Sequence, residues 1–350
     1  MARIENILII GSVCKGAIEN FFSKGFELQG AKVTTYAIAD NYSAAISKSV
    51  VNRAINKVSP GIFYRPLNRQ LLSFLKRKTF DVILVFKGME LLPETVRELK
   101  EHARVLANYN CDHPFRFYSP GAGNNNVLDS IPYYDVHFSY AKRIVEQLRS
   151  NFHKEAQCIP FGFDSETDPR TVRSALDCNG RFLFIGAYDQ ERAGYLDELK
   201  HDKLEIYGNT KWKTRNSLKP YILKVYQHRE IFGNEYISAI HTCWGVINLL
   251  RMQNLKENSH NMRTFEVPGY AGLLLSQRTE EQMEYFEADK EAIYFSGIDE
   301  LRDKMSFLEN NQHLINGIKA AAYERSIKSK YSYNDRSAQM FNWLQSYFNQ

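Results

Sequence analysis

An arginine and a glutamate lie three residues apart in the segment NSHNMRTFEVPGYAG, residues 258–272. Pro268 lacks an N–H and is tolerated only in the first turn of a helix, which predicts a helix beginning at Arg263 or Thr264. The free amides of a helix N-terminus and the fork of an arginine both favour a phosphate group. The carboxylate of Glu266 can accept two hydrogen bonds from vicinal hydroxyls, such as those of a ribose. The segment therefore predicts a site for a nucleoside diphosphate.

The same residues also have a purely structural interpretation. A glutamate in a first helical turn interacts favourably with the helix dipole, and Arg263 with Glu266 at i, i+3 can form an ordinary surface ion pair. Gly269 and Gly272 disfavour helix, so we expect a short helix that lets a ligand or another backbone approach closely. The residue chemistry leaves both interpretations equally open.

Two glycines frame the loop GSVCKGAI, which follows the first apolar run. Gly11 and Gly16 have the spacing of a Walker A loop, but Ala17 and Ile18 stand where that motif requires Lys and Ser or Thr. The loop also lacks the GxGxxG pattern of dinucleotide-binding folds. As the first turn between a strand and a helix, Gly11 and Gly16 can line a ligand cleft or simply permit a tight turn.

Charged side chains near the ends of other apolar runs are further candidates. Lys87 follows DVILVF and is expected to line the cleft, and Arg192 lies in a predicted helix; each could stabilise a departing diphosphate or be a solvated cation. In CDHP, Asp112 or His113 could act as a general base or bind hydroxyls, whereas Pro114 also fits a simple turn. No apolar-flanked Asp-x-Asp pattern occurs, so we expect a site that works without a metal ion.

The elements that would position these residues alternate along the chain. Unbroken apolar runs are typical of parallel strands covered on both faces, and helical stretches separate them. In the first half we expect a helix at 17–29 and strands at 7–10, 32–36, 80–86, 103–109, 134–140 and 156–163. This alternation predicts a doubly wound α/β sheet.

A polar segment at 164–180 interrupts the pattern, and a second alternation follows it. Its expected strands are 181–186, 204–208, 244–250, 272–276 and 291–296. We therefore predict an N-terminal Rossmann-like domain, a linker, a C-terminal Rossmann-like domain and a final helix packing back on the N-terminal domain, at 1–165, 166–180, 181–335 and 336–350. The two domains are expected to face a central cleft that holds the ligand.

The composition limits the classes of function. The 350 residues carry 45 Lys and Arg against 40 Asp and Glu, and the net charge of +5 is spread along the chain. This mild excess favours a small anionic ligand and does not indicate a nucleic-acid-binding protein. It also allows peripheral association with the inner face of a membrane and a lipid-linked acceptor, although we identify no basic amphipathic helix.

Cysteine usage and hydropathy bear on the compartment. The five cysteines include no CxxC pair, so we expect neither a disulfide framework nor a zinc site. No run of about 18 apolar residues occurs, and the apolar part of MARIENILIIGS is too short for a signal peptide. These features favour a cytoplasmic protein.

A longer stretch resembles a known family. NMRTFEVPGYAGLLLSQRTEEQMEYFEADKEAIYFSGIDEL, residues 261–301, is similar to the CgeB-like (spore maturation protein-like) glycosyltransferases, which are related to the glycosyl transferases of group 1 and belong to the GT-B class. The likeness extends to FIGAYDQERAGYLDEL at 184–199, LEIYGNTKW at 204–212 and KYSYNDRSAQMFNWL at 330–344. It is dense after residue 181 and thin before residue 80.

This resemblance implies a hexosyltransferase-like enzyme of the GT-B fold. Such an enzyme moves a sugar from a nucleotide-activated donor, such as a UDP- or GDP-sugar, to a glycan, lipid-linked or protein acceptor, and needs no separate cofactor. The N-terminal domain would meet the acceptor and the C-terminal domain would hold the donor. The resemblance to retaining GT-B families also suggests retention of the anomeric configuration. Surface polysaccharide assembly and protein glycosylation both fit such an activity. The donor-binding residues that it implies are Gly186, Arg192, Asn261, Arg263, Thr264, Glu266 and Gly272.

The sequence departs from the family pattern at the proposed donor site. Larger retaining GT-B enzymes have a second glutamate eight residues before the first, and Asn258 stands at that position here. His260 and Asn261 are only approximate counterparts of the family's residues. Tyr270 replaces a smaller residue and would narrow the site or stack within it.

Two other functions fit the same architecture. A nucleotide-sugar epimerase would need acid and base groups at the sugar carbon rather than an acceptor groove. A non-catalytic nucleotide-sugar-binding module would bind UDP or GDP without turnover, and its partner would contact the first 80 residues.

Overall fold

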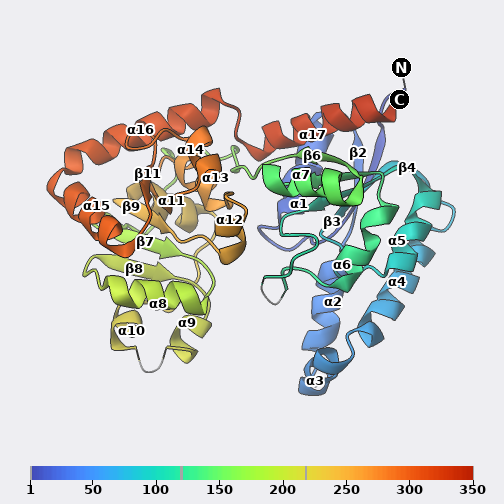
Figure 1. The fold of residues 1–350 in the computed structure, drawn as a ribbon, viewed down its shortest axis with the longest axis horizontal. Coiled ribbons are helices and arrows are strands. Elements are labelled where there is room, and N and C mark those ends of the chain that lie inside the picture. The colour runs from blue at the N-terminus through green and yellow to red at the C-terminus, as the bar shows by residue number, and fades with distance from the viewer. Residues whose placement is uncertain (1, 119–120, 217–218, 350) are drawn as a thin grey trace. The chain divides into compact units, whose positions relative to one another are not determined.

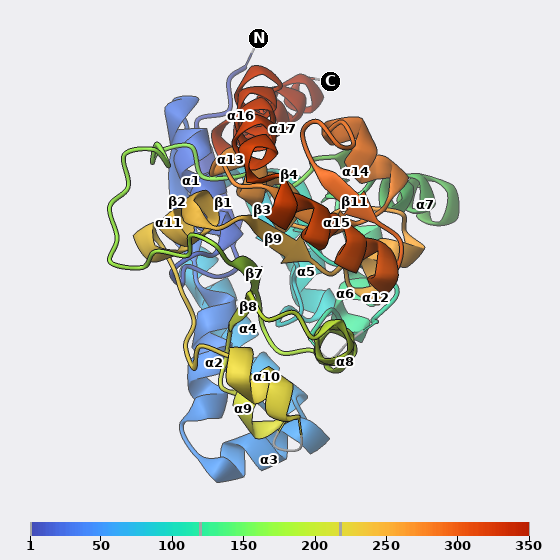
Figure 2. The same cartoon turned by 90° about the vertical axis from the view of Figure 1, so that its left-hand side faces the viewer.

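The computed structural model describes residues 2–118, 121–216 and 219–349. The chain forms two compact units (Figures 1 and 2): unit 1 comprises Met1–Pro160 and Tyr333–Gln350, and unit 2 comprises Phe161–Ser332. The chain thus leaves unit 1 once and returns to it once. The segment 166–180 lies within unit 2, and the last helix lies within unit 1.

Unit 1 is built on a six-stranded parallel sheet of order β2-β1-β3-β4-β5-β6. From β1 the chain winds first to one side and then to the other, so the direction reverses between β1 and β3. This arrangement confirms the predicted doubly wound sheet. The strands are β1 Asn6–Ile10, β2 Lys32–Tyr36, β3 Phe80–Phe86, β4 Ala103–Asn110, β5 Val136–Ser139 and β6 Glu155–Cys158.

Helices cover both faces of this sheet (Figure 1). They are α1 Ile18–Leu28, α2 Ile38–Ser47, α3 Val50–Val58, α4 Gly61–Leu75, α5 Pro93–Leu99, α6 Asn125–Ser130, α7 Lys142–Phe152 and α17 Tyr333–Phe348, with short 3-10 turns η1 Lys100–His102 and η2 Ile131–Tyr133. The last four residues of β1 and the last five of β3 are apolar and buried, because helices cover both sides of the sheet.

The last helix, α17, completes unit 1 by packing on α1. The ring of Tyr333 stacks on that of Phe21 with 4.8 Å between centroids. A Cβ on Gly25 would lie 2.2 Å from Cβ of Ser337, so the absence of a side chain at Gly25 allows the two helices to touch. Phe26 of α1 lies 6.2 Å from Phe341 of α17, measured between ring centroids.

Unit 2 repeats the same winding with a five-stranded parallel sheet of order β11-β10-β9-β7-β8. Here the direction reverses between β7 and β9. The strands are β7 Phe182–Ile185, β8 Leu204–Tyr207, β9 Gly245–Asn248, β10 Leu274–Gln277 and β11 Ile293–Phe295. The helices are α8 Gln190–Leu199, α9 Lys211–Thr214, α10 Pro220–Val225, α11 Asn234–Thr242, α12 Met252–Lys256, α13 Arg263–Gly269, α14 Glu280–Tyr285, α15 Ile298–Asn310 and α16 Gln312–Lys328.

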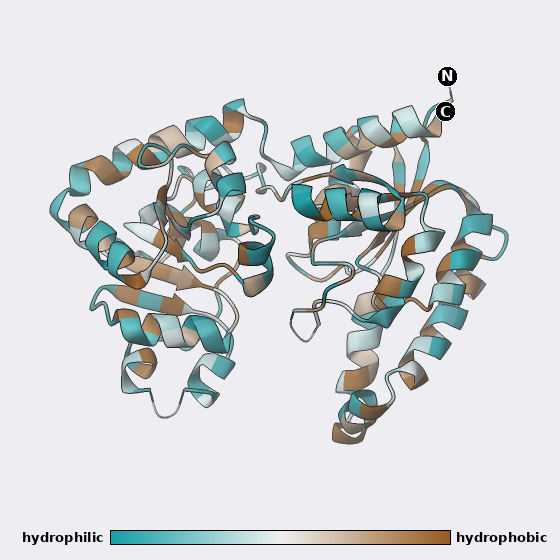
Figure 3. Ribbon diagram, in the orientation of Figure 1, coloured by the Kyte–Doolittle hydropathy of each residue, from teal (hydrophilic) through white to brown (hydrophobic). Residues whose placement is uncertain are grey.

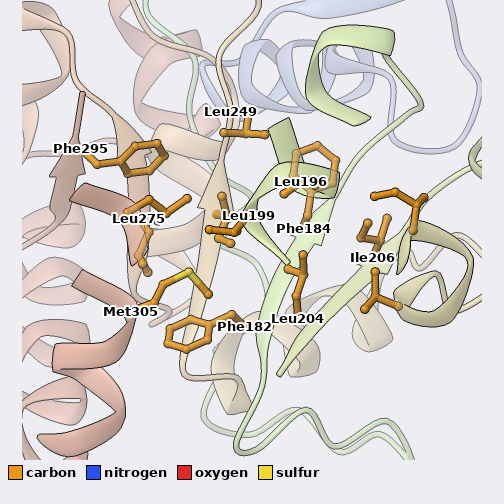
Figure 4. Close-up of a cluster of buried hydrophobic side chains, with 14 of the residues drawn as sticks. Phe182, Phe184, Leu196, Leu199, Leu204, Ile206, Leu249, Leu275, Phe295 and Met305 are labelled. Atoms are coloured by element: carbon orange, nitrogen blue, oxygen red, sulfur yellow. The ribbon is translucent and has the colours of Figure 1, made fainter. Parts of the chain in front are cut away.

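The core of unit 2 lies between one face of this sheet and the helices α8 and α15 (Figure 4). Phe182 and Phe184 alternate with residues that face the other side of β7, and they meet Leu196 of α8 and Met305 of α15 within one buried cluster. Apolar burial on this scale holds the strand ends, and therefore the loops that follow them, in fixed positions.

Two expectations about local structure were wrong. The strand predicted at 156–163 ends at Cys158, shortly before Pro160, which has no N–H to donate to a ladder. The helix of the RTFEVP segment begins at Arg263 as predicted, but Pro268 lies in its last turn and not in its first. The helix ends at Gly269, one residue after the proline.

Among the described residues, no helix is both long enough and apolar enough to cross a bilayer.

Candidate functional site

The loops after β7 and β9 form the point in unit 2 where the winding direction reverses. These two strands are parallel neighbours, and doubly wound sheets bind their ligands beyond the carboxyl ends of such strands. Three arginines follow them in the chain. Arg192 lies in the first turn of α8, Arg251 is the residue before α12, and Arg263 is the first residue of α13.

The positive charges of Arg251 and Arg263 both act on Arg192. Burial, together with the positive charges of Arg251 and Arg263, lowers the pKa of Arg192 to about 10, against the opposing charge of Asp189. A bound anion would relieve this repulsion and the cost of burying the charge.

Arg192 also has a side-chain donor that makes no hydrogen bond among the described residues. Its Nε is buried and has no hydrogen-bond partner in the described part of the chain. The first amides of α8 are already used, because Asp189 accepts hydrogen bonds from the amides of Glu191 at 3.0 Å and Arg192 at 3.2 Å. The positive charge available here therefore comes from side chains and not from the helix terminus. A buried N–H without a partner is uncommon and calls for an explanation such as a ligand.

Arg263 and Glu266 form the i, i+3 ion pair that one of the two sequence interpretations predicts. Tyr236 of α11 donates a 2.8 Å hydrogen bond to Oε2 of Glu266, the same oxygen that Arg263 contacts. Burial alone would lower the pKa of Arg263, but Tyr236 and Glu266 raise it above its usual value, so the guanidinium stays charged. Among the described residues, Oε1 of Glu266 accepts no hydrogen bond, which leaves one carboxylate oxygen for a ligand hydroxyl.

A buried polar network fixes α13 against the strand ends. Gln282 of α14 accepts hydrogen bonds from the hydroxyls of Thr264 and Ser276, each at 2.9 Å. Asn261 donates to Asn248 at 2.8 Å, and Asn248 donates to Ser276 at 3.0 Å. Thr264 is fully buried in this network. The network positions α13 through the buried side of the helix, whereas the side chain of Arg263 is partly exposed and that of Glu266 is nearly buried beside it.

Of the two glycines expected at the donor site, Gly272 is closely packed, whereas a Cβ on Gly186 would lie no nearer than 3.4 Å to the ring of Phe184. Gly186 follows β7, and its carbonyl accepts a 2.9 Å hydrogen bond from Nε1 of Trp212. A Cβ on Gly272 would lie 2.4 Å from Cγ2 of Ile240 and 3.0 Å from the carbonyl oxygen of Val267. Gly272 therefore lets α11 approach the turn between α13 and β10.

In unit 1, the residues predicted to line a cleft meet at the reversal point between β1 and β3. Lys87 follows β3, and its Nζ lies 2.7 Å from Oδ2 of Asp112, the second residue after β4. Burial opposes the charge of Lys87, but Asp112 and Cys111 raise its pKa above the usual value. Lys87 and Asp112 thus form an ion pair within unit 1. His113 is buried, with its ring edge-on to Phe115 at 4.4 Å between centroids.

The glycine loop after β1 binds carboxylates of its own chain. The amide of Ser12 donates to Glu19 at 2.8 Å, and the amide of Val13 donates to Asp40 at 2.6 Å. A Cβ on Gly11 would lie 2.5 Å from Oε1 of Glu19, so Gly11 makes room for that side chain, whereas Gly16 has a positive φ of 83° and faces open space. Because these amides already contact carboxylates, the loop is not a phosphate cradle, in agreement with its lack of a Walker A motif.

Sequence reasoning missed two residues of the unit 2 site, Arg251 and Tyr236. Arg251 directly follows the apolar run WGVINLL, so the rule that pointed to Lys87 after DVILVF would also have found it. Tyr236 lies in the first turn of α11 and carries no local signal. Among the described residues, no group of three or more His, Cys, Asp or Glu side chains is arranged to hold a metal ion.

Comparison with known proteins agrees with the residue pattern. Residues 192–342 match a family model described as "Glycosyl transferase-like". The matched segment contains Arg192, Arg251, Arg263 and Glu266, as well as the start of α17. No curated protein sequence matches the chain.

Solved structures of two sugar-phosphate synthases and of a putative epimerase share the fold. Sucrose-phosphate synthase from Thermosynechococcus elongatus superimposes with a TM-score of 0.71 at 9% identity over 99% of each chain. The UDP-forming α,α-trehalose-phosphate synthase from Burkholderia vietnamiensis gives 0.65 at 13% identity over 98% of this chain and 100% of that one. A putative UDP-N-acetylglucosamine 2-epimerase from Listeria monocytogenes gives 0.57 at 15% identity over 99% and 97%. These likenesses show the two-domain GT-B fold that the sequence predicted.

Proposed function

We propose that the protein is a glycosyltransferase that binds a nucleoside diphosphate sugar at the reversal point of unit 2. The observation that carries the proposal is the group of three arginines after β7 and β9, in which Arg192 is repelled by Arg251 and Arg263 and has a buried Nε donor without a hydrogen-bond partner among the described residues. The family match over residues 192–342 supports the same class of enzyme. Two phosphates in series are a natural partner for several converging guanidinium groups.

Each part of the donor has a candidate partner in this site. The arginines hold the diphosphate, and Oε1 of Glu266 accepts hydrogen bonds from the ribose hydroxyls. Tyr236 and Arg263 orient the Glu266 carboxylate through its other oxygen. Thr264, Asn261 and the close-packed Gly272 act as positioning residues around α13, and Gly186 anchors the end of β7 through the hydrogen bond that its carbonyl accepts from Trp212.

In the transfer step, the bond between the anomeric carbon and the diphosphate oxygen breaks, and a bond to the acceptor oxygen forms. The arginines stabilise the negative charge that develops on the leaving diphosphate. We propose that the configuration is retained, that no metal ion is required and that a phosphate oxygen of the leaving group takes the acceptor's proton. Asp112, held by Lys87, is the candidate group in unit 1 for contacting acceptor hydroxyls; His113 remains a second candidate.

The narrower assignments are part of the same proposal. These are membership of the CgeB-like group, a cytoplasmic location and a role in surface polysaccharide or glycoconjugate synthesis. They rest on the resemblance of residues 261–301 and on the lack of a CxxC pair among the five cysteines of the sequence.

Calorimetric titration with UDP, GDP, ADP and CMP, each with and without EDTA, tests donor binding. We expect one diphosphate to bind in both conditions and Arg251→Ala to weaken its affinity by about 10- to 100-fold, the usual effect of losing a hydrogen bond to a charged group. Arg278→Ala is the matched control, because Arg278 is an equally exposed arginine paired with Glu300. If no nucleotide binds, or if both variants weaken binding alike, the site assignment is wrong.

The products of a reaction with the donor then distinguish a glycosyltransferase from an epimerase and from a non-catalytic binding module. A glycosyltransferase releases free nucleoside diphosphate only when an acceptor is present, and the anomeric proton coupling of the product reports retention. An epimerase converts the donor sugar without an acceptor, and a binding module leaves the donor unchanged.

A further inference from the structure

The helix α3 of unit 1 turns its apolar side outward. Val50, Val51 and Val58 are 74%, 65% and 87% exposed, and no residue of the helix is buried. With 3.6 residues per turn, positions 50, 51, 54, 55 and 58 share one side of the helix, and all five are valine, alanine or isoleucine. Ordinary surface helices place this side against the core.

The polar side of α3 is the one that contacts the protein. The side-chain amide of Asn52 donates to the carbonyl of Ala45 at 2.8 Å, and the hydroxyl of Tyr42 donates to the side-chain oxygen of Asn56 at 2.7 Å. These bonds attach α3 to α2 and fix its orientation. The exposure of the valines is therefore built into the packing of the helix.

All charged residues in the segment around α3 are cationic. Between Asp40 and Asp81 the sequence contains no Asp or Glu, and its charged residues are Lys48, Arg53, Lys57, Arg65, Arg69, Lys76, Arg77 and Lys78. Those closest to the valines in sequence, Lys48, Arg53 and Lys57, are all exposed. Ile62, at the start of α4, extends the apolar surface and is 56% exposed.

The place of α3 in unit 1 favours contact with a large flat surface. Figures 1 and 2 show α3 at the outer tip of α2 and α4, away from the sheet, and Figure 3 shows hydrophobic residues at this tip. We name the apolar tip by its residues Val50, Val51, Val58 and Ile62.

We propose that the apolar tip inserts into the surface of an anionic lipid bilayer, with the acid-free segment 41–80 attracted to the lipid headgroups. Aliphatic side chains on one side of a short helix and cations around them are the features of a shallow interfacial contact. Each Lys or Arg near an anionic membrane strengthens binding by about fivefold. A stable protein–protein contact buries about 1,600 Å², far more than four aliphatic side chains supply. This inference requires no nucleotide and no activity, and it goes beyond the proposed glycosyl transfer.

Co-sedimentation of the full chain with extruded vesicles tests the proposal. We expect binding to phosphatidylcholine vesicles that contain about one third phosphatidylglycerol, weaker binding to pure phosphatidylcholine, and loss of binding at about 0.5 M salt. The triple substitution Val50→Ser, Val51→Ser and Val58→Ser should lower the partition coefficient at least about tenfold. Arg53→Gln with Lys57→Gln should lower it about 10- to 25-fold.

Two controls keep the test specific. Phe307→Ser removes an apolar side chain that is 52% exposed in α15 of unit 2, and it should leave vesicle binding unchanged. In Val58→Trp, tryptophan emission should shift to shorter wavelength on anionic vesicles and be quenched by brominated lipids. Thermal melts confirm that each variant is folded.

Several outcomes would overturn the proposal. These are failure of the wild type to bind anionic vesicles, equal effects of the triple and Phe307→Ser variants, or an unchanged spectrum of Val58→Trp. A wild-type dimer in solution that the triple variant abolishes, without vesicle binding, would assign the apolar tip to self-association instead.

Discussion

The hydroxyl of Tyr236 and the carboxylate of Glu266 are joined by a 2.8 Å hydrogen bond that leaves the second carboxylate oxygen open. Tyr236→Phe removes this donor and keeps the ring that lies 4.9 Å from the guanidinium of Arg263. We expect the dissociation constant for the bound nucleotide to rise about three- to tenfold, because one neutral donor orients the carboxylate. Calorimetry measures the change. Tyr323→Phe in α16 should have no effect, and an unchanged affinity in Tyr236→Phe would show that the carboxylate needs no such support.

Gln282 is the centre of the network under α13. Besides accepting from Thr264 and Ser276, it donates to the carbonyl of Gln277 at 2.9 Å and to the hydroxyl of Thr279 at 3.0 Å. Gln282→Leu should lower the free energy of unfolding by about 2–4 kcal/mol, because it leaves several buried polar groups unsatisfied. Urea denaturation measures the loss, with the exposed Gln312→Leu as a control. A loss below about 1 kcal/mol would mean that the network re-forms without Gln282.

His137 should make the protein sensitive to acid. Burial lowers its pKa from 6.5 to about 4, while its Nε2 contacts the carbonyl of Ile131 at 3.0 Å. Because the folded-state pKa is below the unfolded one, the unfolded chain takes up a proton first as the pH falls from 6.5 towards 4. The free energy of unfolding should fall by about 3 kcal/mol over this interval from His137 alone.

A comparison of variants isolates this effect from other titrating groups. The difference in unfolding free energy between about pH 7.5 and pH 4.5 should be smaller in His137→Gln than in the wild type. His313→Gln, at an exposed position of α16, should retain the wild-type difference. Equal pH dependence in all three proteins would show that His137 titrates normally.

Gly208 and Gly317 should respond oppositely to alanine. A Cβ on Gly208 would lie 2.2 Å from the carbonyl oxygen of Gly186 and 2.5 Å from Nε1 of Trp212, so backbone must move. We expect Gly208→Ala to destabilise the protein by about 1–3 kcal/mol. Gly317 lies in α16 with open space around its Cβ direction, and Gly317→Ala should stabilise by about 0.5–1 kcal/mol. Thermal and urea denaturation measure both; the same sign for the two variants would contradict the steric argument.

Parallel strands were the most predictable part of the fold. The segments 32–36 and 80–86 became β2 and β3 with the expected bounds. The apolar run of β3 is typical of a strand covered on both sides, whereas β2 is a partly exposed edge strand rich in β-branched residues. The sheet order was not predictable in detail, since periodicity does not say which strands pair. The segment of α3 shows a different limit: we identify no basic amphipathic helix from the sequence, and the exposed valines together with the bonds of Asn52 and Asn56 reveal a helix whose apolar side faces outward.

The residues of the candidate site were predictable where a charged side chain directly follows a strand. Arg192 and Arg263 were found in this way or by resemblance, and the structure shows Arg192 under the influence of Arg263. Thr264 lies next to Arg263 in sequence, yet its side chain enters the buried network of Gln282, because successive side chains of a helix point about 100° apart. Tyr236 comes from a distant helix and could not be connected to Glu266 without coordinates.

The helix α17 has a consequence for the order in which the protein acquires its structure. Unit 1 consists of residues 1–160 and 333–350, so a ribosome that has made the whole first sheet has not yet made the helix that covers Phe21 and Phe26. Unit 2 is continuous and can close before unit 1 is complete. During synthesis the surface of α1 that packs on α17 therefore stays uncovered until unit 2 has been translated and α17 follows it.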